Sequence, residues 1–167
     1  EGKMRATGNP LDVALNGKNF FVVRMPDGSE RYTRNGHFRL GDDGTLVTSG
    51  NRPVLDTSGS PLVFTAQDEG IDIAPDGTVS TKGRGIIGKL NVVTFEDLSA
   101  LEKAGESMFT SEAKPIPATG YSVMQAMIED SNVEPIIEIN NLINIARRYQ
   151  AVAQALDQQQ ELESKAI

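Results

Sequence analysis

The chain has 167 residues, of which 38% are apolar and 23% charged, with a formal net charge of -7 and no cysteine. This length suffices for one sizeable domain with an appendage, and the missing cysteines exclude disulfides and thiolate-bound metals. The acidic balance argues against nucleic-acid binding, and no apolar run approaches the roughly 18 residues of a membrane span or forms a signal-peptide core.

The first half of the chain has the pattern of short β-strands separated by turns. Leu11–Leu15 alternates apolar and polar residues, and Phe20–Met25 is a short apolar run typical of a buried strand. Pro26–Ser29 predicts a turn, and Asn35-Gly36 between two strand-like flanks predicts a β-hairpin. Further short strands follow to about residue 95. This spacing predicts an antiparallel β-sandwich or barrel-like domain.

Two stretches of this region resemble each other. Asp43–Gly50 and Asp76–Gly83 both contain Asp-Gly-Thr followed by an apolar residue, and both predict turn, strand and turn. A repeat architecture requires at least three units. We therefore interpret the similarity as one turn chemistry used twice.

After residue 95 the strand pattern weakens. Asp97–Gly105 predicts a short helical turn, and Thr110–Gly120 predicts an exposed loop. Tyr121–Asp130 predicts a last strand that leads back toward the start of the chain.

The final segment has a different pattern. From Val133 onward there is no glycine and only one proline, Pro135. Ser131 and Glu134 have the spacing of a capping box, and Pro135 is tolerated in a first helical turn. The fold class predicted here is therefore mainly β, with a long C-terminal α-helix from about residue 133 to 164. The predicted domains are a β-rich domain, residues 1–130, and a C-terminal assembly helix, residues 131–167.

An apolar seam runs along the predicted helix at successive steps of 3, 4, 3, 4 and 3 residues, which is a heptad pattern. The helix could pack on its own β domain or on partner helices in an assembly, and the length of the seam favours the second interpretation. The residues of the seam are Ile139, Leu142, Ala146, Tyr149, Ala153 and Leu156.

Several motifs suggest chemistry but have ordinary structural explanations. Gly83–Gly88 matches G-x-G-x-x-G, yet a strand-like stretch follows instead of the helix that dinucleotide binding requires. Asp42-Asp43-Gly44 lacks the further acids of a calcium loop. His37 is the only histidine, so a catalytic triad or a histidine metal site would depend on it alone. We therefore expect no cofactor and no metal.

A carboxylate pair is the remaining route to catalysis. Asp68, Glu69 and Asp72 could in principle supply the two acids of a glycosidase. The chain has no tryptophan and few aromatic residues to form a sugar platform, and acids beside turns are common. We expect no catalytic residue.

Five ordered blocks resemble the flagellar basal-body rod and hook proteins. The first, TGNPLDVALNGKNFFVV, resembles the opening of their β domain, and SNVEPIIEINNLINIARRYQA resembles their C-terminal signature. The blocks cover most of the chain and lie at Thr7–Val23, Tyr32–Leu55, Ile73–Ser80, Gly88–Phe109 and Ser131–Ala151. Within the family the proximal rod proteins are the most similar, with distal rod proteins as the main alternative. Hook proteins carry a further outer domain for which this chain has no room.

This resemblance implies a structural, non-enzymatic subunit of the bacterial flagellar rod, the axial shaft that spans the periplasm and transmits torque. It implies self-association, neighbouring axial proteins as partners, and export by the flagellar type III apparatus without a cleaved signal peptide. The C-terminal helix would join an inner coiled-coil layer through the seam. Family members begin with a helical segment, which we expect to precede Glu1.

Two other classes of function remain open. A polysaccharide-acting enzyme on a β scaffold would require a cleft with converging acids of perturbed pKa. A soluble adaptor with a coiled-coil tail would share the helix but would not polymerise.

Overall fold

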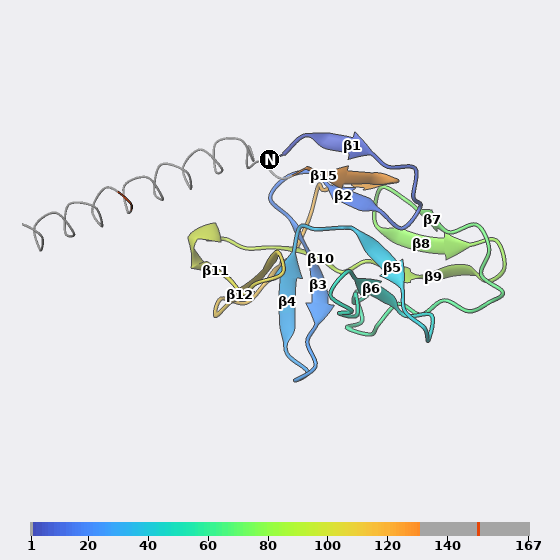
Figure 1. The fold of residues 1–167 in the computed structure, drawn as a ribbon, viewed down its shortest axis with the longest axis horizontal. Helices are drawn as coiled ribbons and strands as arrows, with labels where there is room; N and C mark the ends of the chain where they lie inside the picture. Colours follow the sequence, from blue (N-terminus) through green and yellow to red (C-terminus); the bar gives the residue numbers. More distant parts are fainter. Residues whose placement is uncertain (1, 131–149, 151–167) are drawn as a thin grey trace, which may run out of the picture. The chain divides into compact units, whose positions relative to one another are not determined.

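The computed structural model describes residues 2–130 and residue 150. The chain divides into two compact units, residues 1–130 and residues 131–167. All the secondary-structure elements of the described part lie in the first unit, which we call the β unit (Figure 1). Every strand pair in it is antiparallel.

The largest sheet has six strands in the order β11-β12-β4-β3-β10-β13. Its centre is the β3–β4 hairpin, closed by the predicted turn at Pro26–Ser29. Met25 N donates to Ser29 O at 2.8 Å, and Gly28 adopts a φ of 83° that favours glycine. The strands are β3 (Phe20–Arg24), β4 (Glu30–Thr33), β10 (Val92–Thr94), β11 (Leu101–Lys103), β12 (Met108–Ser111) and β13 (Ile116–Pro117).

Strand β3 is buried on both faces, as its continuous apolar run predicts. Phe21 and Val23 belong to one cluster of buried side chains, and Phe20 and Val22 belong to a second. Each cluster contains an edge-to-face aromatic pair. The Phe21 and Phe38 rings lie 5.1 Å apart, for example. The unit is therefore organised around one strand with a core on each side.

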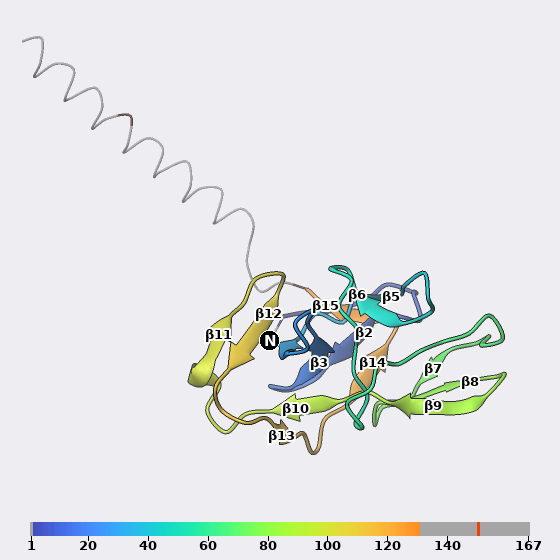
Figure 2. The same cartoon turned by 90° about the horizontal axis from the view of Figure 1, so that it is seen from below.

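Four smaller sheets complete the unit. In Figures 1 and 2 the β7–β9 sheet lies at the opposite end of the unit from β11 and β12. The three-stranded sheet is formed by β7 (Asp72–Ile73), β8 (Thr78–Thr81) and β9 (Gly85–Lys89). The two-stranded sheets pair β5 (Phe38–Leu40) with β6 (Leu46–Thr48), β2 (Val13–Leu15) with β14 (Val123–Gln125), and β1 (Met4–Ala6) with β15 (Met127–Glu129).

The two similar Asp-Gly-Thr stretches form the same kind of turn. Asp43 Oδ1 accepts from Thr45 N at 3.0 Å, and Asp76 Oδ1 accepts from Thr78 N at 3.0 Å. The glycine between them has a φ of 81° in the first turn and 86° in the second. The interpretation as one turn chemistry used twice is confirmed.

The last part of the unit follows the prediction in part, because β11 lies within the helical turn predicted over 97–105 and β13 lies within the loop predicted over 110–120. A 3-10 turn, η1 (Leu98–Ala100), begins at Asp97, whose side chain accepts from Ser99 N. Residues 121–130 return to the start of the chain, where β14 pairs with β2 and β15 pairs with β1. The predicted loop over 110–120 contains the ends of β12 and the short strand β13.

The hairpin predicted at Asn35-Gly36 is wrong. β4 and β5, on either side of it, belong to different sheets. Gly36 instead lies against the backbone of β2, where Val13 N donates to its carbonyl at 2.9 Å. A Cβ at Gly36 would lie 1.7 Å from Val13 O. The glycine is required by this close approach and not by a tight turn.

The predicted fold class also needs correction. Residues 2–130 contain no α-helix and form strands and one 3-10 turn. The apolar residues of this part alternate or occur in short runs between Gly- and Asp-containing turns, and such patterns specify strands. The long helix predicted over residues 133–164 falls, apart from Gln150, outside the described residues. The fold of residues 2–130 is therefore mainly β, arranged as one six-stranded sheet and four smaller sheets around two core clusters.

Candidate assembly site

The predicted seam lies outside the described part of the chain. Its residues are Ile139, Leu142, Ala146, Tyr149, Ala153 and Leu156. The candidate site that the structure does describe is the part of the β unit that directly precedes residue 131 in sequence. We call it the base of the β unit; it consists of β1, β15, Asp130 and Arg34.

At the base, β1 and β15 run antiparallel beside each other (Figure 1). Three residue pairs form the ladder, from Met4 opposite Glu129 to Ala6 opposite Met127. The backbone N–H of Asp130 donates to Lys3 O at 2.8 Å and extends it by one step. The chain therefore reaches the second unit from a strand that is paired with the beginning of the first.

A partly buried ion pair lies beside this ladder. The Nε and Nη2 atoms of Arg34 lie 3.0 and 2.7 Å from Glu129 Oε2. The Arg34 side chain is 22% exposed and that of Glu129 is 13% exposed. Arg34 Nη1 also donates to the carbonyls of Gly17 and Asn19, and Glu129 Oε1 accepts from Gly2 N at 2.7 Å. One arginine thus joins three segments that are distant in the sequence.

A second ion pair at the base is exposed. Arg5 Nε lies 3.1 Å from Asp130 Oδ1, and the two side chains are 58% and 44% exposed. Solvent screening and side-chain entropy make such a pair worth little.

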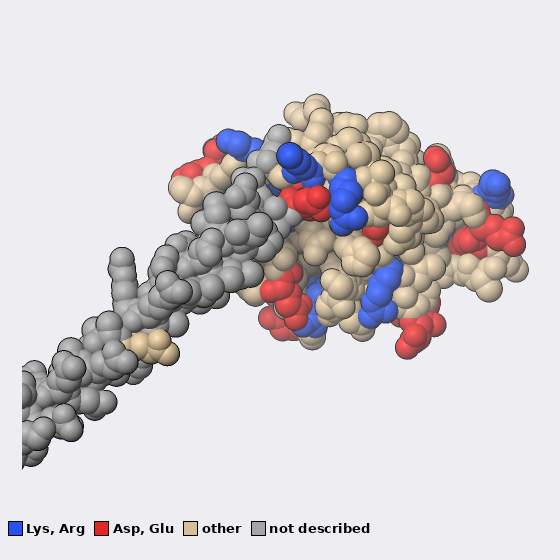
Figure 3. Space-filling model, turned by 45° about the horizontal axis from the view of Figure 1, so that its top comes forward, with Lys and Arg blue, Asp and Glu red and all other residues tan. Residues whose placement is uncertain are grey.

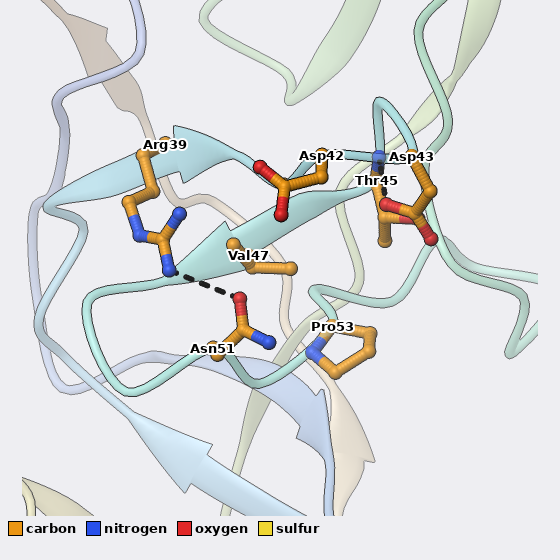
Figure 4. Close-up of a pocket in the computed structure, with 8 residues that line it drawn as sticks. Arg39, Asp42, Asp43, Thr45, Val47, Asn51 and Pro53 are labelled. Carbon is orange, nitrogen blue, oxygen red and sulfur yellow. Dashed lines mark hydrogen bonds between the residues drawn. The ribbon is translucent and has the colours of Figure 1, made fainter.

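A shallow groove of about 430 Å³ lies over the β5–β6 hairpin (Figure 4). Val47 and Pro53 form its apolar floor, and Asp42 points into it. At one end Arg39 donates to Asn51 Oδ1 at 3.0 Å. At the other end the backbone N–H of Thr45 lowers the pKa of Asp43, so this acid is ionised at neutral pH. A general acid requires a raised pKa, so Asp43 lacks the property that this role needs.

Of the acids considered for a glycosidase, Asp68 has structural partners. Asp68 accepts from Nε and Nη2 of Arg84 at 2.8 and 2.5 Å, and from Thr65 N and Thr81 Oγ1. The Arg84 guanidinium, with the two threonines, holds the pKa of Asp68 well below its ordinary value despite burial. Asp72 lies in β7, opposite Ser80 of β8. Asp68 therefore ties the loop over 65–68 to the β8–β9 turn.

The remaining motifs also have structural roles. The glycine-rich stretch at Gly83–Gly88 forms the β8–β9 turn and most of β9. Strand therefore stands where dinucleotide binding would need a helix N-terminus. His37 Nδ1 lies 2.6 Å from Oδ1 of the buried Asp12, in the bridge between β2 and the segment before β5.

Within residues 2–130 no group of three His, Asp or Glu side chains is placed to hold a metal ion. In the same part of the chain no helix is long and apolar enough to cross a membrane. On the face shown in Figure 3, lysine and arginine side chains alternate with acidic ones and form no continuous basic field. The surface in view lacks the footprint of a nucleic-acid interface.

Sequence reasoning missed Arg34 and Glu129. Arg34 lies within the Tyr32–Leu55 block that resembles the family, so the sequence could have marked it as a residue of interest. Its partner lies 95 residues away, and no local pattern connects the two.

Two family models match the chain. The model described as "Flagellar hook protein FlgE/F/G D1 domain" matches residues 14–81, and "Flagellar basal body rod FlgEFG protein C-terminal" matches residues 124–167. The first covers the centre of the β unit. The second begins in β14 and continues through the second unit.

Named relatives align over nearly the whole chain. "Flagellar basal-body rod protein FlgF" of Caulobacter vibrioides is 38% identical over 100% of this chain and 68% of its own length. FlgG of Buchnera aphidicola subsp. Acyrthosiphon pisum is 34% identical over 90% of this chain and 61% of its own length. FlgF of Salmonella typhimurium is 31% identical over 99% of this chain and 70% of its own length. The chain thus spans about two thirds of the length of these relatives.

Proposed function

The chain belongs to the family of flagellar basal-body rod proteins, and we propose that it forms a structural subunit of the rod, polymerising with its neighbours into the shaft that transmits torque. The observation that carries this proposal is the 38% identity to an FlgF rod protein over 100% of the chain. The resemblance to rod proteins is thereby confirmed. The 38% identity to FlgF of Caulobacter vibrioides exceeds the 34% identity to FlgG of Buchnera aphidicola subsp. Acyrthosiphon pisum, which supports the proximal type.

The division of the chain supports separate roles for its two units. The β unit has two core clusters around one central strand, which suits a stiff body that presents lateral surfaces to its neighbours. The family model for the C-terminal part extends through residue 167. We infer that residues 131–167 contact neighbouring subunits through the apolar positions from Ile139 to Leu156.

Two finer properties belong to this proposal. Export by the flagellar type III apparatus would deliver the protein to the basal body without a cleaved signal peptide. The protein would act as a building block and not as an enzyme. In support, Asp68 of the described unit is occupied by structural hydrogen bonds, and Asp43 is held ionised within its turn.

Deletion of the gene tests the proposal. We expect the deletion strain to be non-motile, with basal bodies that lack a complete rod, because a shaft with a missing segment cannot carry the structures beyond it. The complete gene supplied on a plasmid should restore swimming. A gene truncated after residue 130 should not, because it lacks the residues proposed to contact neighbouring subunits. Normal swimming and complete rods in the deletion strain would contradict the proposal.

A further inference from the structure

The last strand of the β unit, β15, is short and directly precedes the second unit in sequence. β15 has three residues and pairs with β1 in a two-stranded sheet. Asp130 follows it, and residue 131 is the first of the second unit. Force applied to the backbone at residue 131 reaches β15 through the chain, and a two-stranded pair of this length is only marginally stable by itself.

Arg34 supplies an additional attachment for this strand. Four donor contacts leave its guanidinium, two to the Glu129 carboxylate and two to the carbonyls of Gly17 and Asn19. This use of the planar fork is specific to arginine, because a lysine ammonium cannot reach acceptors on opposite sides in a fixed plane. Low exposure of both side chains strengthens the contact relative to a surface pair.

The other end of this attachment lies in the largest sheet. Arg34 directly follows β4, which pairs with β3 on one side and with β12 on the other. Its neighbour Thr33 is buried and donates from Oγ1 to Ser107 O at 2.9 Å. A force that reaches Glu129 is therefore passed into an interior strand, where it is shared by ladders on both sides.

We propose that the Arg34–Glu129 ion pair is a mechanical clasp that transmits force between residue 131 onward and the six-stranded sheet of the β unit. The clasp rests on the proposed function, since only an assembled rod carries torque through its subunits. With the clasp closed, β15 and the sheet move as one body. With it open, the force falls on the ladder to β1, which is only one hydrogen bond longer at each end than its three residue pairs, and this ladder separates first.

The exposed Arg5–Asp130 pair provides a matched control. It also involves an arginine and a carboxylate at the base, and it lies on the same β1–β15 ladder. It differs in exposure and in having one guanidinium contact to its acid. Removing its charge by Arg5→Gln should leave the ladder intact.

Hydrogen exchange on the full 167-residue chain measures the clasp directly. In Arg34→Lys we expect the amides of β1 and β15 to exchange about tenfold faster or more, the loss expected for a partly buried charged hydrogen bond. The amides of β3 and β4 should retain their protection, and Arg5→Gln should stay within about twofold of wild type. Equal exchange of β1 and β15 in Arg34→Lys and Arg5→Gln would overturn the clasp.

Glu129→Gln is a second variant, in case Arg34→Lys does not fold. It keeps the shape of the side chain and removes its charge, and it should loosen the same two strands. Loss of protection in β3 and β4 in both variants would show a general requirement for folding and would also overturn the proposal.

Swimming under load tests the transmission of force. Chromosomal Arg34→Lys should permit rod assembly but reduce swimming speed in medium thickened with methylcellulose, relative to Arg5→Gln. Speeds equal to those of Arg5→Gln at every viscosity, with loosened β1 and β15, would overturn the role in force transmission. Failure of the proposed function looks different, because deletion of the gene would then leave rods and swimming intact whatever Arg34→Lys does to exchange.

Discussion

Substituting Gly36 by alanine tests the close packing of the β unit where a glycine lies against the backbone of another strand. The residue lies where the segment between β4 and β5 crosses β2, and the added Cβ would lie 1.7 Å from Val13 O and 3.2 Å from Phe21 Cε2. An ordinary contact begins at 3.4 Å, so the two backbones would have to separate by about 1.7 Å. Val13 and Phe21 are both fully buried, so neither can move without disturbing the core.

The expected cost follows from two contributions. Overpacking a close-packed interior costs about 1–3 kcal/mol. Separation of the strands also breaks the 2.9 Å hydrogen bond from Val13 N to Gly36 O, worth about 1 kcal/mol. We therefore expect Gly36→Ala to lower the free energy of unfolding by about 2–4 kcal/mol, a large part of the stability of an ordinary domain. Urea unfolding followed by circular dichroism measures this change.

Gly59→Ala is the control for this prediction. Gly59 has a φ of 79°, but no atom lies within 4 Å of an added Cβ. Its cost is the strain of a left-handed conformation alone, about 1 kcal/mol. If Gly36→Ala costs no more than Gly59→Ala, the close approach of the two backbones is not what requires a glycine at position 36.

Acid titration tests whether the hydrogen-bonded Asp68 carboxylate stabilises the β unit. Its folded-state pKa lies below the unfolded value of about 3.9, so the stabilisation is complete above pH ~4 and disappears as pH falls through the folded value. In Asp68→Asn the free energy of unfolding should therefore decrease less between about pH 6 and pH 2 than in the wild type. An equal decrease in both proteins would show that the ionised Asp68 carboxylate does not stabilise the fold. Tyr149→Asp should block incorporation into rods while the far-ultraviolet spectrum of the β unit is unchanged, because it places a charge among the proposed contacts. Normal motility in that strain would show that Tyr149 is not such a contact.

Local chemistry made part of this fold predictable. The turns at Pro26–Ser29, Asp43-Gly44 and Asp76-Gly77 follow from glycines with positive φ and aspartates that accept from the backbone two residues on. The doubly buried strand β3 follows from its unbroken apolar run. These signals are contained within a few neighbouring residues, which is why the sequence alone carries them.

The errors arise where distant segments meet. Asn35-Gly36 has the composition of a hairpin turn, but the pairing of β4 with β12 and of β5 with β6 separates its two flanks. Gly36 is needed instead because its backbone lies against β2, which is more than twenty residues earlier in the chain. The Arg34–Glu129 pair was invisible for the same reason. The seam from Ile139 to Leu156 stays a prediction, because those residues lie outside the described part of the chain.

The most direct test of the central claim is the composition of purified basal bodies. Basal bodies isolated from the bacterium that makes this protein can be examined by quantitative mass spectrometry, with gold-labelled antibody against the β unit to locate it. We predict several copies per basal body, with label confined to the rod. Basal bodies that contain a complete rod but none of this protein would contradict its assignment as a rod subunit.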